Sequence, residues 1–450
     1  MKIINSIFKA YDIRGVYPTQ VNEKVAYLLG RAYADFLKPK KVIVGRDVRA
    51  QSATMEKELI RGLLEQGVDV CQIGQITTDM LFFAVGHFGF DGGIAVSASH
   101  NAPEYGGFKF VRKQAIPVTG NSGLLDVKAI IQKGKFRKVY KKGKLTSLDI
   151  FADYKKFVLS FVKLAKIKPF KVVFNTLNGA MGPVIEQVVK DLPLQMIWID
   201  KKPDPKLRKG EPNPLLPQRR ADTIAIIKTH QADFGVSWDG DGDRCFFFDE
   251  KGEFVPAPFV TAILMEYIAK EKPGAKVIID LRAIYPIVQM AQKYGIKLSL
   301  VKSGRIFMQQ QLRKQNAFMA AEMTAHYFFR DNFYSDNGII PFLMVLKLLS
   351  DKNQKLSKLL ADLRKKFFMI DEIKIASPNG EKIISALKAK YIDGQQNDTD
   401  GLTVEYPNWR FNLRSSNTEP VLKLNIESTD KTLLSKKQKE IIEISKKMSK

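Results

Sequence analysis

Cysteine is scarce in this chain, and its scarcity excludes two classes of cross-linked protein. Cys71 and Cys245 are the two cysteines in a sequence of 450 residues, and they stand far apart. A disulfide framework or a zinc cluster needs several cysteines at short spacing, so the sequence predicts neither. Isolated thiols are typical of a reducing compartment, and we therefore expect a cytoplasmic protein.

Long apolar runs are missing as well. No stretch reaches the roughly 18 consecutive apolar residues that a membrane-spanning helix needs. Residues 1–8 lack the apolar core and the cleavage site of a secretory signal. A Gly-x-Ser-x-Gly elbow is also absent, which argues against serine-hydrolase chemistry. We therefore expect no membrane partner.

Acidic residues are outnumbered by basic ones. The chain has 72 Lys and Arg against 47 Asp and Glu, a formal net charge of +25. Such an excess can indicate polyanion binding, which stays open as an alternative. Much of it is lysine scattered over expected helix faces, as in residues 436–439, and no motif combines basic residues with stacking aromatics along one groove. We predict a lysine-rich solvated surface and no nucleic-acid partner.

A repeated strand–helix–strand pattern organises most of the chain. Its copies begin near residues 42, 171 and 276, and each spans about thirty residues, the length of a parallel βαβ crossover. From residue 372 onward, alternating segments indicate antiparallel strands, and residues 429–448 a closing helix. The predicted fold class is therefore α/β: three tandem related α/β domains with mixed sheets and a smaller C-terminal α+β domain, arranged around a central active-site cleft. The expected domains are 1–148, 149–250, 251–365 and 366–450.

A serine-containing turn follows one of the buried strands. The apolar run 92–96 predicts a strand, and Ser97-Ala98-Ser99-His100-Asn101 comes directly after it. A rigid strand can aim a hydroxyl into a cleft, and His100 offers a proton relay or a phosphate donor beside it. Lys109, in a second expected turn at 106–109, can bring an ammonium back to the same place. The alternative is a polar turn without chemistry.

An acidic loop is the strongest motif in the sequence. Asp239, Asp241 and Asp243 alternate with glycines between two apolar runs, so their carboxylates can face one point. Oxygen ligands of this kind suit a hard cation, magnesium or calcium. An EF-hand is not predicted, because Arg244 occupies the position that needs glycine and the flanks indicate strands. A solvated acidic turn and a calcium-binding structural module remain as alternatives.

Two further loops carry recognition chemistry. Residues 414–420, Arg-Ser-Ser-Asn-Thr-Glu-Pro, combine a guanidinium, hydroxyls, an amide and turn N–H groups into a possible phosphate cradle. Residues 321–326 place a carboxylate and an imidazole on one loop, which suits recognition of sugar hydroxyls. An ordinary polar hairpin turn and an ordinary capped loop are the alternatives.

Together these four loops resemble those of the α-D-phosphohexomutases. That family has a serine loop near T-A-S-H-N-P, a metal loop D-G-D-x-D-R, a sugar loop G-E-x-S-G-H and a phosphate loop R-x-S-N-T-E-P, and this chain has counterparts in the same order. Residues 8–15, Phe-Lys-Ala-Tyr-Asp-Ile-Arg-Gly, are similar to the family's N-terminal signature. The resemblance covers essentially the whole chain and is greatest for the bacterial phosphomannomutases.

The resemblance implies an isomerase that interconverts mannose 6-phosphate and mannose 1-phosphate. Its mechanism would use an active-site phosphoserine and a hexose 1,6-bisphosphate, which also serves as the activator. A dual-specificity phosphomannomutase/phosphoglucomutase, or mainly a phosphoglucomutase, is the alternative. The implied partners are small-molecule hexose phosphates, and the implied assembly is a monomer or a homodimer.

The resemblance also assigns roles to individual residues. Ser99, Asp239, Asp241 and Asp243 would hold one Mg²⁺. Acid–base work and charge stabilisation would fall to Ser99, His100, Lys109, Arg14 and Arg244. The implied substrate-binding residues are Tyr11, Arg282, Arg305, Glu322, Thr324, His326, Arg414, Ser416, Asn417 and Thr418.

Overall fold

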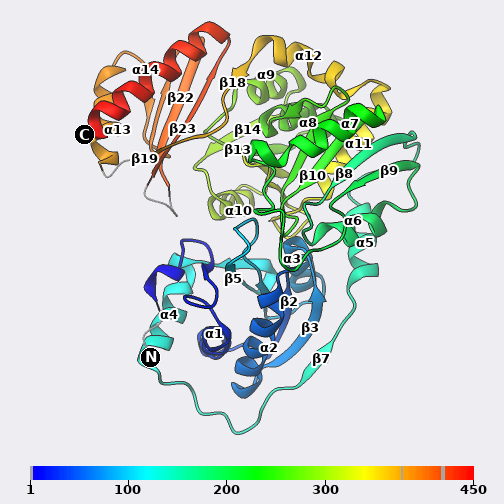
Figure 1. Ribbon diagram of the computed structural model, residues 1–450, viewed down its shortest axis with the longest axis vertical. Coiled ribbons are helices and arrows are strands. Elements are labelled where there is room, and N and C mark those ends of the chain that lie inside the picture. Colours follow the sequence, from blue (N-terminus) through cyan, green and yellow to red (C-terminus); the bar gives the residue numbers. More distant parts are fainter. Residues whose placement is uncertain (1–3, 377–378, 417–420, 450) are drawn as a thin grey trace. The chain divides into compact units, whose positions relative to one another are not determined.

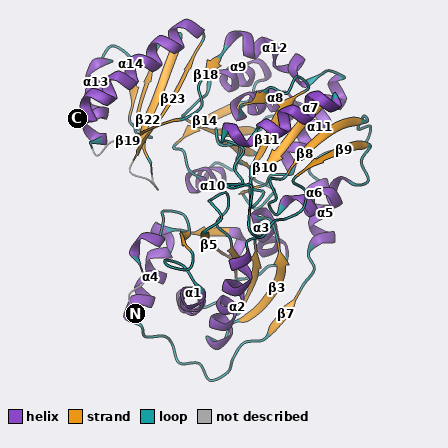
Figure 2. Ribbon diagram, viewed as in Figure 1, coloured by secondary structure: helices purple, strands orange, loops and turns teal. Residues whose placement is uncertain are grey.

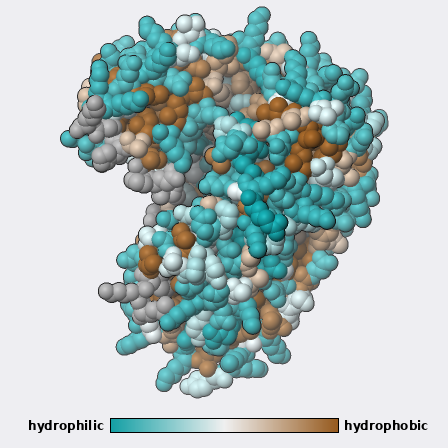
Figure 3. Space-filling model, in the orientation of Figure 1, coloured by the Kyte–Doolittle hydropathy of each residue, from teal (hydrophilic) through white to brown (hydrophobic). Residues whose placement is uncertain are grey.

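The computed structural model describes residues 4–376, 379–416 and 421–449 (Figure 1). Its strands form four sheets. The chain divides into two compact units, Met1–Phe254 with Phe329–Asn353 and Val255–Phe328 with Gln354–Lys450. No helix in the described part of the chain has the length and apolar character that crossing a membrane requires. Hydrophilic residues cover most of the face seen in Figure 3.

The first sheet has seven strands in the order β1-β5-β4-β2-β3-β7, with β6 paired to β5. The strands are β1 (Ile13–Val16), β2 (Lys41–Arg46), β3 (Asp69–Gln75), β4 (Gly92–Val96), β5 (Tyr105–Arg112), β6 (Ile116–Val118) and β7 (Leu145–Ser147). The accompanying helices are α1 (Glu23–Leu37), α2 (Ala50–Glu65), α3 (Thr78–His87) and α4 (Leu124–Lys133). Helix α1 begins after Asn22, whose Oδ1 accepts a hydrogen bond from Val25 N at 3.0 Å and so satisfies a free amide of the first turn.

The second sheet has the order β12-β11-β10-β8-β9. Its strands are β8 (Phe170–Asn175), β9 (Leu194–Ile199), β10 (Phe234–Trp238), β11 (Cys245–Asp249) and β12 (Phe254–Val255). The helices of this region are α5 (Phe151–Leu159), α6 (Met181–Val189), α7 (Ala221–His230) and α11 (Ile340–Lys352). Helix α11 comes from much later in the chain, and its Phe342 lies 5.5 Å from Phe174 and 6.0 Å from Trp238 between ring centroids. These rings form part of the apolar core that fixes the strand ends of this sheet.

The third sheet has the order β14-β13-β15-β16-β17. Its strands are β13 (Lys276–Asp280), β14 (Lys297–Val301), β15 (Met319–Ala321), β16 (Tyr327–Phe329) and β17 (Ser335–Asp336). The helices are α8 (Ala257–Glu271), α9 (Tyr285–Tyr294), α10 (Arg305–Lys314) and α12 (Leu356–Lys366). Strand β13 pairs in parallel with both β14 and β15, so the loops that follow β13 and β15 leave the same edge of the sheet.

The fourth sheet has the order β18-β23-β22-β21-β20, with β19 on β23, and its strand pairs are antiparallel. The strands are β18 (Phe368–Met369), β19 (Ile373–Ala376), β20 (Gln395–Asn397), β21 (Leu402–Glu405), β22 (Trp409–Ser415) and β23 (Val421–Ser428). Helices α13 (Gly380–Lys390) and α14 (Lys431–Ser449) lie on one face of this sheet (Figure 2). Asp430 caps α14, because its Oδ1 accepts from Leu433 N at 2.8 Å.

The predicted α/β fold class with a smaller C-terminal α+β domain is confirmed, and the central cleft stays a prediction. The three strand–helix–strand units are present, and in each the two strands pair in parallel: β2 with β3, β8 with β9, and β13 with β14. The first two sheets are mixed, because β4 pairs antiparallel to β5 and β10 pairs antiparallel to β11. The C-terminal sheet with its two helices is the smaller α+β domain. The domain limits at residues 148, 250 and 365 stay predictions.

One local prediction is wrong. Residues 106–109 are not a turn, because they lie inside strand β5 and Lys109 pairs with Ala95 of β4. The glycines here serve close strand contact. A Cβ on Gly107 would lie 2.5 Å from Ile13 O and 2.7 Å from Ser97 O, closer than any side chain allows. Lys109 therefore reaches the end of β4 from a neighbouring strand.

Candidate active site

The serine loop lies at the carboxyl end of β4, as the sequence predicts. Ser99 is buried and adopts a left-handed backbone conformation, with φ at 52°. Its N–H donates to Ser97 Oγ at 2.9 Å, which fixes the turn. Its own hydroxyl donates to Asp241 Oδ1 at 2.6 Å. The structure thus joins the predicted nucleophile to the predicted metal loop, although they are 142 residues apart in the sequence.

The acidic loop connects β10 to β11, so two strands flank it as expected. Asp239, Asp241 and Asp243 are at most 1% exposed, and each contributes an oxygen within 4.8 Å of the others. Three carboxylates buried so close together repel one another unless a cation joins them. An all-oxygen set with a serine hydroxyl alongside is the donor chemistry that Mg²⁺ prefers, so the residues present fit this ion.

The side chain of Lys109 places a positive charge at this loop. Its Nζ donates to Asp243 Oδ2 at 2.9 Å and to Thr78 Oγ1 at 3.1 Å, and it is also paired with Asp241. Burial and the charge of Asp243 raise the pKa of Asp241. The charge of Lys109, with hydrogen bonds from Lys109 and Ser99, outweighs both, so the pKa of Asp241 lies below its usual value. Asp241 is therefore held in its ionised form.

Three more predicted residues surround Ser99. His100 Nδ1 lies 3.1 Å from Ser99 Oγ and 3.8 Å from Asp239 Oδ2. Arg244 is buried and donates through Nε to Asp239 Oδ2 at 2.8 Å. Within the described part of the chain, its Nη2 is buried without a hydrogen-bond partner, which suits an anion at this place. Arg14 donates to Asp12 Oδ2 at 2.8 Å and to Ala98 O at 3.4 Å, on the serine loop itself.

Sequence reasoning missed Asp47 and Arg49, which hold the serine loop from the segment that directly follows β2. Arg49 is 1% exposed. Its guanidinium donates to four loop carbonyls, at 2.5–3.2 Å: those of Ser99, Asn101, Ala102 and Tyr105. Asp47 Oδ2 accepts from Ala98 N at 3.2 Å. The available signal was a Gly-Arg-Asp-x-Arg loop directly after a buried strand, at the sheet edge that the serine loop also leaves.

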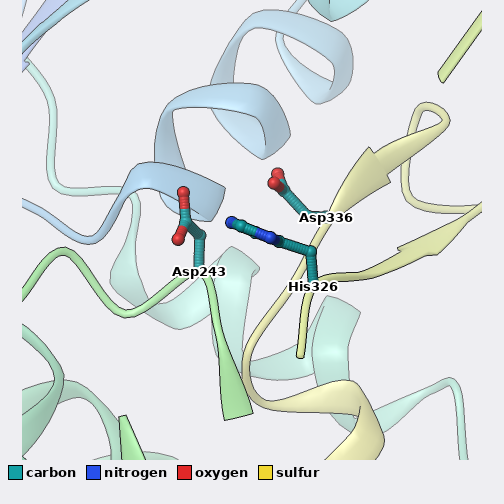
Figure 4. Close-up of side chains that lie close together, drawn as sticks. All are labelled: Asp243, His326 and Asp336. Atoms are coloured by element: carbon teal, nitrogen blue, oxygen red, sulfur yellow. The ribbon is translucent and has the colours of Figure 1, made fainter. Parts of the chain in front are cut away.

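A second missed group lies behind the metal loop. Asp79 is fully buried in the first turn of α3 and accepts from Tyr154 OH at 2.6 Å. Burial raises the pKa of Asp79 to about 7, and hydrogen bonds from Thr77 and Tyr154 offset this only in part. Asp336 of β17 lies close to Asp243 (Figure 4). A carboxylate oxygen of Asp336 is within 4.8 Å of one of Asp243. No sequence motif singles out Asp79 or Asp336, since each depends on a distant strand.

The remaining predicted residues fall mainly in the second unit. After β15, Glu322 accepts from Gly304 N at 2.8 Å and pairs with His326 at 3.0 Å. Burial raises the pKa of Glu322, but His326 and Arg282 outweigh it and lower the pKa to about 2. Thr324 Oγ1 lies 3.2 Å from His326 Nδ1. The predicted sugar loop is thus a connected set of an ionised carboxylate, an imidazole and a hydroxyl.

The phosphate loop is described in part. Arg414 lies near the end of β22, and Ser416 N donates to Val421 O at 2.9 Å across the hairpin. Asn417 and Thr418 lie outside the described residues. Arg305 is the first residue of α10 and is half-buried. Tyr11, half-buried, precedes β1 in the first unit.

The chain matches the models of four successive family domains. Residues 5–138 match phosphoglucomutase/phosphomannomutase alpha/beta/alpha domain I, and residues 152–252 match domain II. Residues 259–367 match alpha/beta/alpha domain III, and residues 371–444 match the C-terminal domain.

Full-length relatives and solved structures agree with these matches. A phosphomannomutase of Escherichia coli is 41% identical over 450 residues, which covers 98% of this chain and 99% of that protein. A phosphomannomutase of Vibrio cholerae is 38% identical, with 98% of each chain covered. The crystal structure of a phosphoglucomutase/phosphomannomutase family protein from Burkholderia thailandensis has a TM-score of 0.90 at 29% identity, covering 100% of this chain and 99% of that one.

Proposed function

The chain belongs to the phosphoglucomutase/phosphomannomutase family, and from this membership we propose that it interconverts mannose 6-phosphate and mannose 1-phosphate. It is an isomerase that acts as an intramolecular phosphotransferase. The observation that carries the proposal is the hydroxyl of Ser99, which lies 2.6 Å from Asp241 at a buried triad of carboxylates. This is the arrangement that a phosphoryl carrier beside a hard cation requires.

Ser99 carries the phosphoryl group in this mechanism. The bond from its Oγ to phosphorus breaks as the free hydroxyl of the hexose monophosphate forms a new bond to the same phosphorus. The bisphosphate then turns around and returns its other phosphoryl group to Ser99. Asp239, Asp241 and Asp243 would hold Mg²⁺, which would neutralise charge on the transferring group.

Protein groups complete the acid–base and charge chemistry. His100 Nδ1, at 3.1 Å from Ser99 Oγ, relays to Ser99 Oγ the proton that the attacking sugar hydroxyl loses, and the relay runs in reverse when Ser99 is phosphorylated again. Lys109 pairs with the carboxylates of Asp241 and Asp243 and holds both in place. The guanidiniums of Arg14 and Arg244 stabilise the phosphoryl oxygens.

Substrate recognition falls to the second unit together with Tyr11. Glu322 and Thr324 bind sugar hydroxyls, and His326, at 3.0 Å from Glu322, orients that carboxylate. The non-reacting phosphate is held by Arg414, Ser416, Asn417 and Thr418. Arg282, Arg305 and Tyr11 are further substrate contacts in this proposal.

The preferred hexose is mannose, with glucose phosphates also turned over. The two sugars differ in the direction of one hydroxyl, and a hydrogen bond made or missed there is worth about 0.5–1.5 kcal/mol, or up to roughly tenfold in rate. We also propose a cytoplasmic enzyme, because Cys71 and Cys245 are free and buried, and a monomer or homodimer.

A coupled assay tests the function directly. Purified protein is given mannose 1-phosphate or glucose 1-phosphate with Mg²⁺ and the matching 1,6-bisphosphate. We expect turnover of both sugars, faster for mannose. Intact-mass analysis should find one phosphate that is lost in Ser99→Ala and retained in Ser97→Ala. A phosphate retained in Ser99→Ala, or no turnover of either sugar, would contradict the proposal.

A further inference from the structure

Glu372 places a carboxylate among three cations of the second unit. It lies between β18 and β19, and its side chain is 20% exposed. Its oxygens lie 3.0 Å from Lys423 Nζ, 3.5 Å from Arg414 Nη2 and 3.5 Å from Arg282 Nη1. Asn425 Nδ2 also donates to it, at 3.4 Å. This carboxylate is absent from the four motifs and has no role in the proposed mechanism.

The cations around Glu372 are arranged as for an anion. Arg414 of β22 and Lys423 of β23 are directly opposite each other in the antiparallel register. Like charges at such a position repel and destabilise a sheet unless an anion lies between them. Glu372 is that anion in the structure. A sugar phosphate presents the same chemistry, oxygen atoms with negative charge, to the same two side chains.

Other carboxylates nearby do not replace Glu372 in this role. Asp280 binds Arg282 at 2.6 Å, Glu322 lies 4.0 Å from Arg282, and Asp400 lies 3.9 Å from Arg414 Nε. Among the ion pairs of the described residues, Glu372 is the one carboxylate that pairs with Lys423 as well as with Arg414 and Arg282. Burial raises the pKa of Glu372, but the three cations outweigh it and lower the pKa to about 2, so the side chain is ionised throughout the working pH range.

We propose that Glu372 competes with the non-reacting phosphate of the substrate for Arg414, Lys423 and Arg282, an inference that rests on the proposed function of Arg414. In the free enzyme its carboxylate occupies the cations that the phosphate needs. The entering phosphate must displace this carboxylate or bind beside it. Glu372 thereby weakens phosphate binding at this site.

Weak binding here serves the proposed reaction. The bisphosphate must release the phosphate held by Arg414 before it can turn around, so a site that binds too tightly slows the middle of the cycle. A carboxylate of the protein that competes for the same cations speeds that release. Removing Glu372 should therefore tighten substrate binding. Removing a residue that only orients Arg414 would weaken it.

E372Q tests the proposal, because glutamine keeps the size and one oxygen acceptor while it removes the charge. We expect the KM for mannose 1-phosphate and the Kd for inorganic phosphate, measured by calorimetry, to fall about three- to tenfold, and kcat to fall as release slows. E405Q is the control, because Glu405 also pairs with an arginine of this sheet, Arg410, at 3.3 Å. This variant should leave the KM for mannose 1-phosphate and the Kd for inorganic phosphate unchanged.

An unchanged or higher KM in a folded E372Q would overturn the proposal. If E372Q fails to fold, E372D is measured instead, and its KM should also fall. The fall should be smaller, because the shorter side chain keeps the charge and only draws it away from Arg414. Failure of the proposed function is distinguishable, because the wild-type enzyme would then turn over neither sugar. The phosphate Kd of E372Q against wild type would still test the role of Glu372.

Discussion

Replacing Arg49 by methionine removes the main support of the Ser99 loop while it keeps a side chain of similar length. The guanidinium is buried and donates to the carbonyls of Ser99 at 3.0 Å and Ala102 at 2.6 Å, and to those of Asn101 and Tyr105. Methionine has no donor, so all four carbonyls lose this partner. The nearby cation Lys109 is already bound to Asp241 and Asp243 and cannot replace it.

The size of the effect follows from these hydrogen bonds. A buried carbonyl left without a partner costs about 1–3 kcal/mol, so four would cost more than the loop can bear in its present shape. The left-handed conformation of Ser99 already costs about 1–2 kcal/mol, and relaxing it recovers that energy. We therefore expect the loop to rearrange and move Ser99 Oγ away from Asp241. A displacement of about 1 Å lowers a rate about 100-fold, or about 2.7 kcal/mol.

Three measurements separate this local effect from unfolding. Steady-state kinetics should show kcat about 100-fold lower, and intact mass should show slower phosphorylation of Ser99 by the 1,6-bisphosphate. Thermal unfolding should show a loss of only about 1–3 kcal/mol, because the change is confined to one loop. Arg49→Lys should recover about tenfold of the lost rate, since an ammonium can donate to some of the carbonyls.

Arg46→Met is the matched control. Arg46 is on the same strand end, but it pairs with Glu56 at 3.2 Å and does not contact the serine loop through any hydrogen bond in the described part of the chain. We expect its kcat to stay within about threefold of wild type. A folded Arg49→Met with near-normal kcat would refute the reasoning, and so would an equal loss in Arg46→Met.

Two further predictions concern Asp241 of the metal loop and Glu56, a buried residue of α2. Asp241→Asn should raise the Mg²⁺ concentration needed for half-maximal activity while the protein stays folded, because it removes one ligand charge; an unchanged Mg²⁺ titration would contradict the metal assignment. Burial raises the pKa of Glu56 to about 7, and Gln72 and Arg46 offset this only in part, so the folded state loses stability as pH rises through about 7. Glu56→Gln should therefore stabilise the protein at pH 8.5, by up to about 3 kcal/mol, and have little effect at pH 5, as measured by urea unfolding. An equal difference at both pH values would contradict this assignment.

Local patterns were sufficient to predict the sheets and the metal loop. The strand–helix–strand units follow from short apolar runs and their spacing, which require no knowledge of distant contacts. The Asp-Gly-Asp-Gly-Asp loop was correctly placed between two strands for the same reason. The misplaced turn at 106–109 shows where such patterns fail. Two adjacent glycines usually indicate a turn, but Gly107 is needed for close approach to Ile13 of β1 and to Ser97, which directly follows β4.

The missed residues depend on which strands become neighbours. Arg49 and Asp47 reach the serine loop because β2 pairs in parallel with β4, with Arg46 opposite Val96. Asp79 and Tyr154 meet across 75 residues, and neither belongs to a recognisable motif. Nothing in a single sequence states these pairings. A search for charged residues after every parallel strand would have found Asp47 and Arg49, but not Asp79, which lies on a helix.

Gly240 shows that the metal motif and the serine loop depend on each other. From the sequence, a glycine between Asp239 and Asp241 is expected because it lets their carboxylates face one point. In the structure a Cβ on Gly240 would lie 2.7 Å from Ser99 O and 2.6 Å from Pro212 Cγ. The first is a backbone atom that cannot rotate away, so any side chain here would push the serine loop off the carboxylates. The glycine is therefore required for the 2.6 Å hydrogen bond between Ser99 and Asp241 as much as for the shape of its own loop.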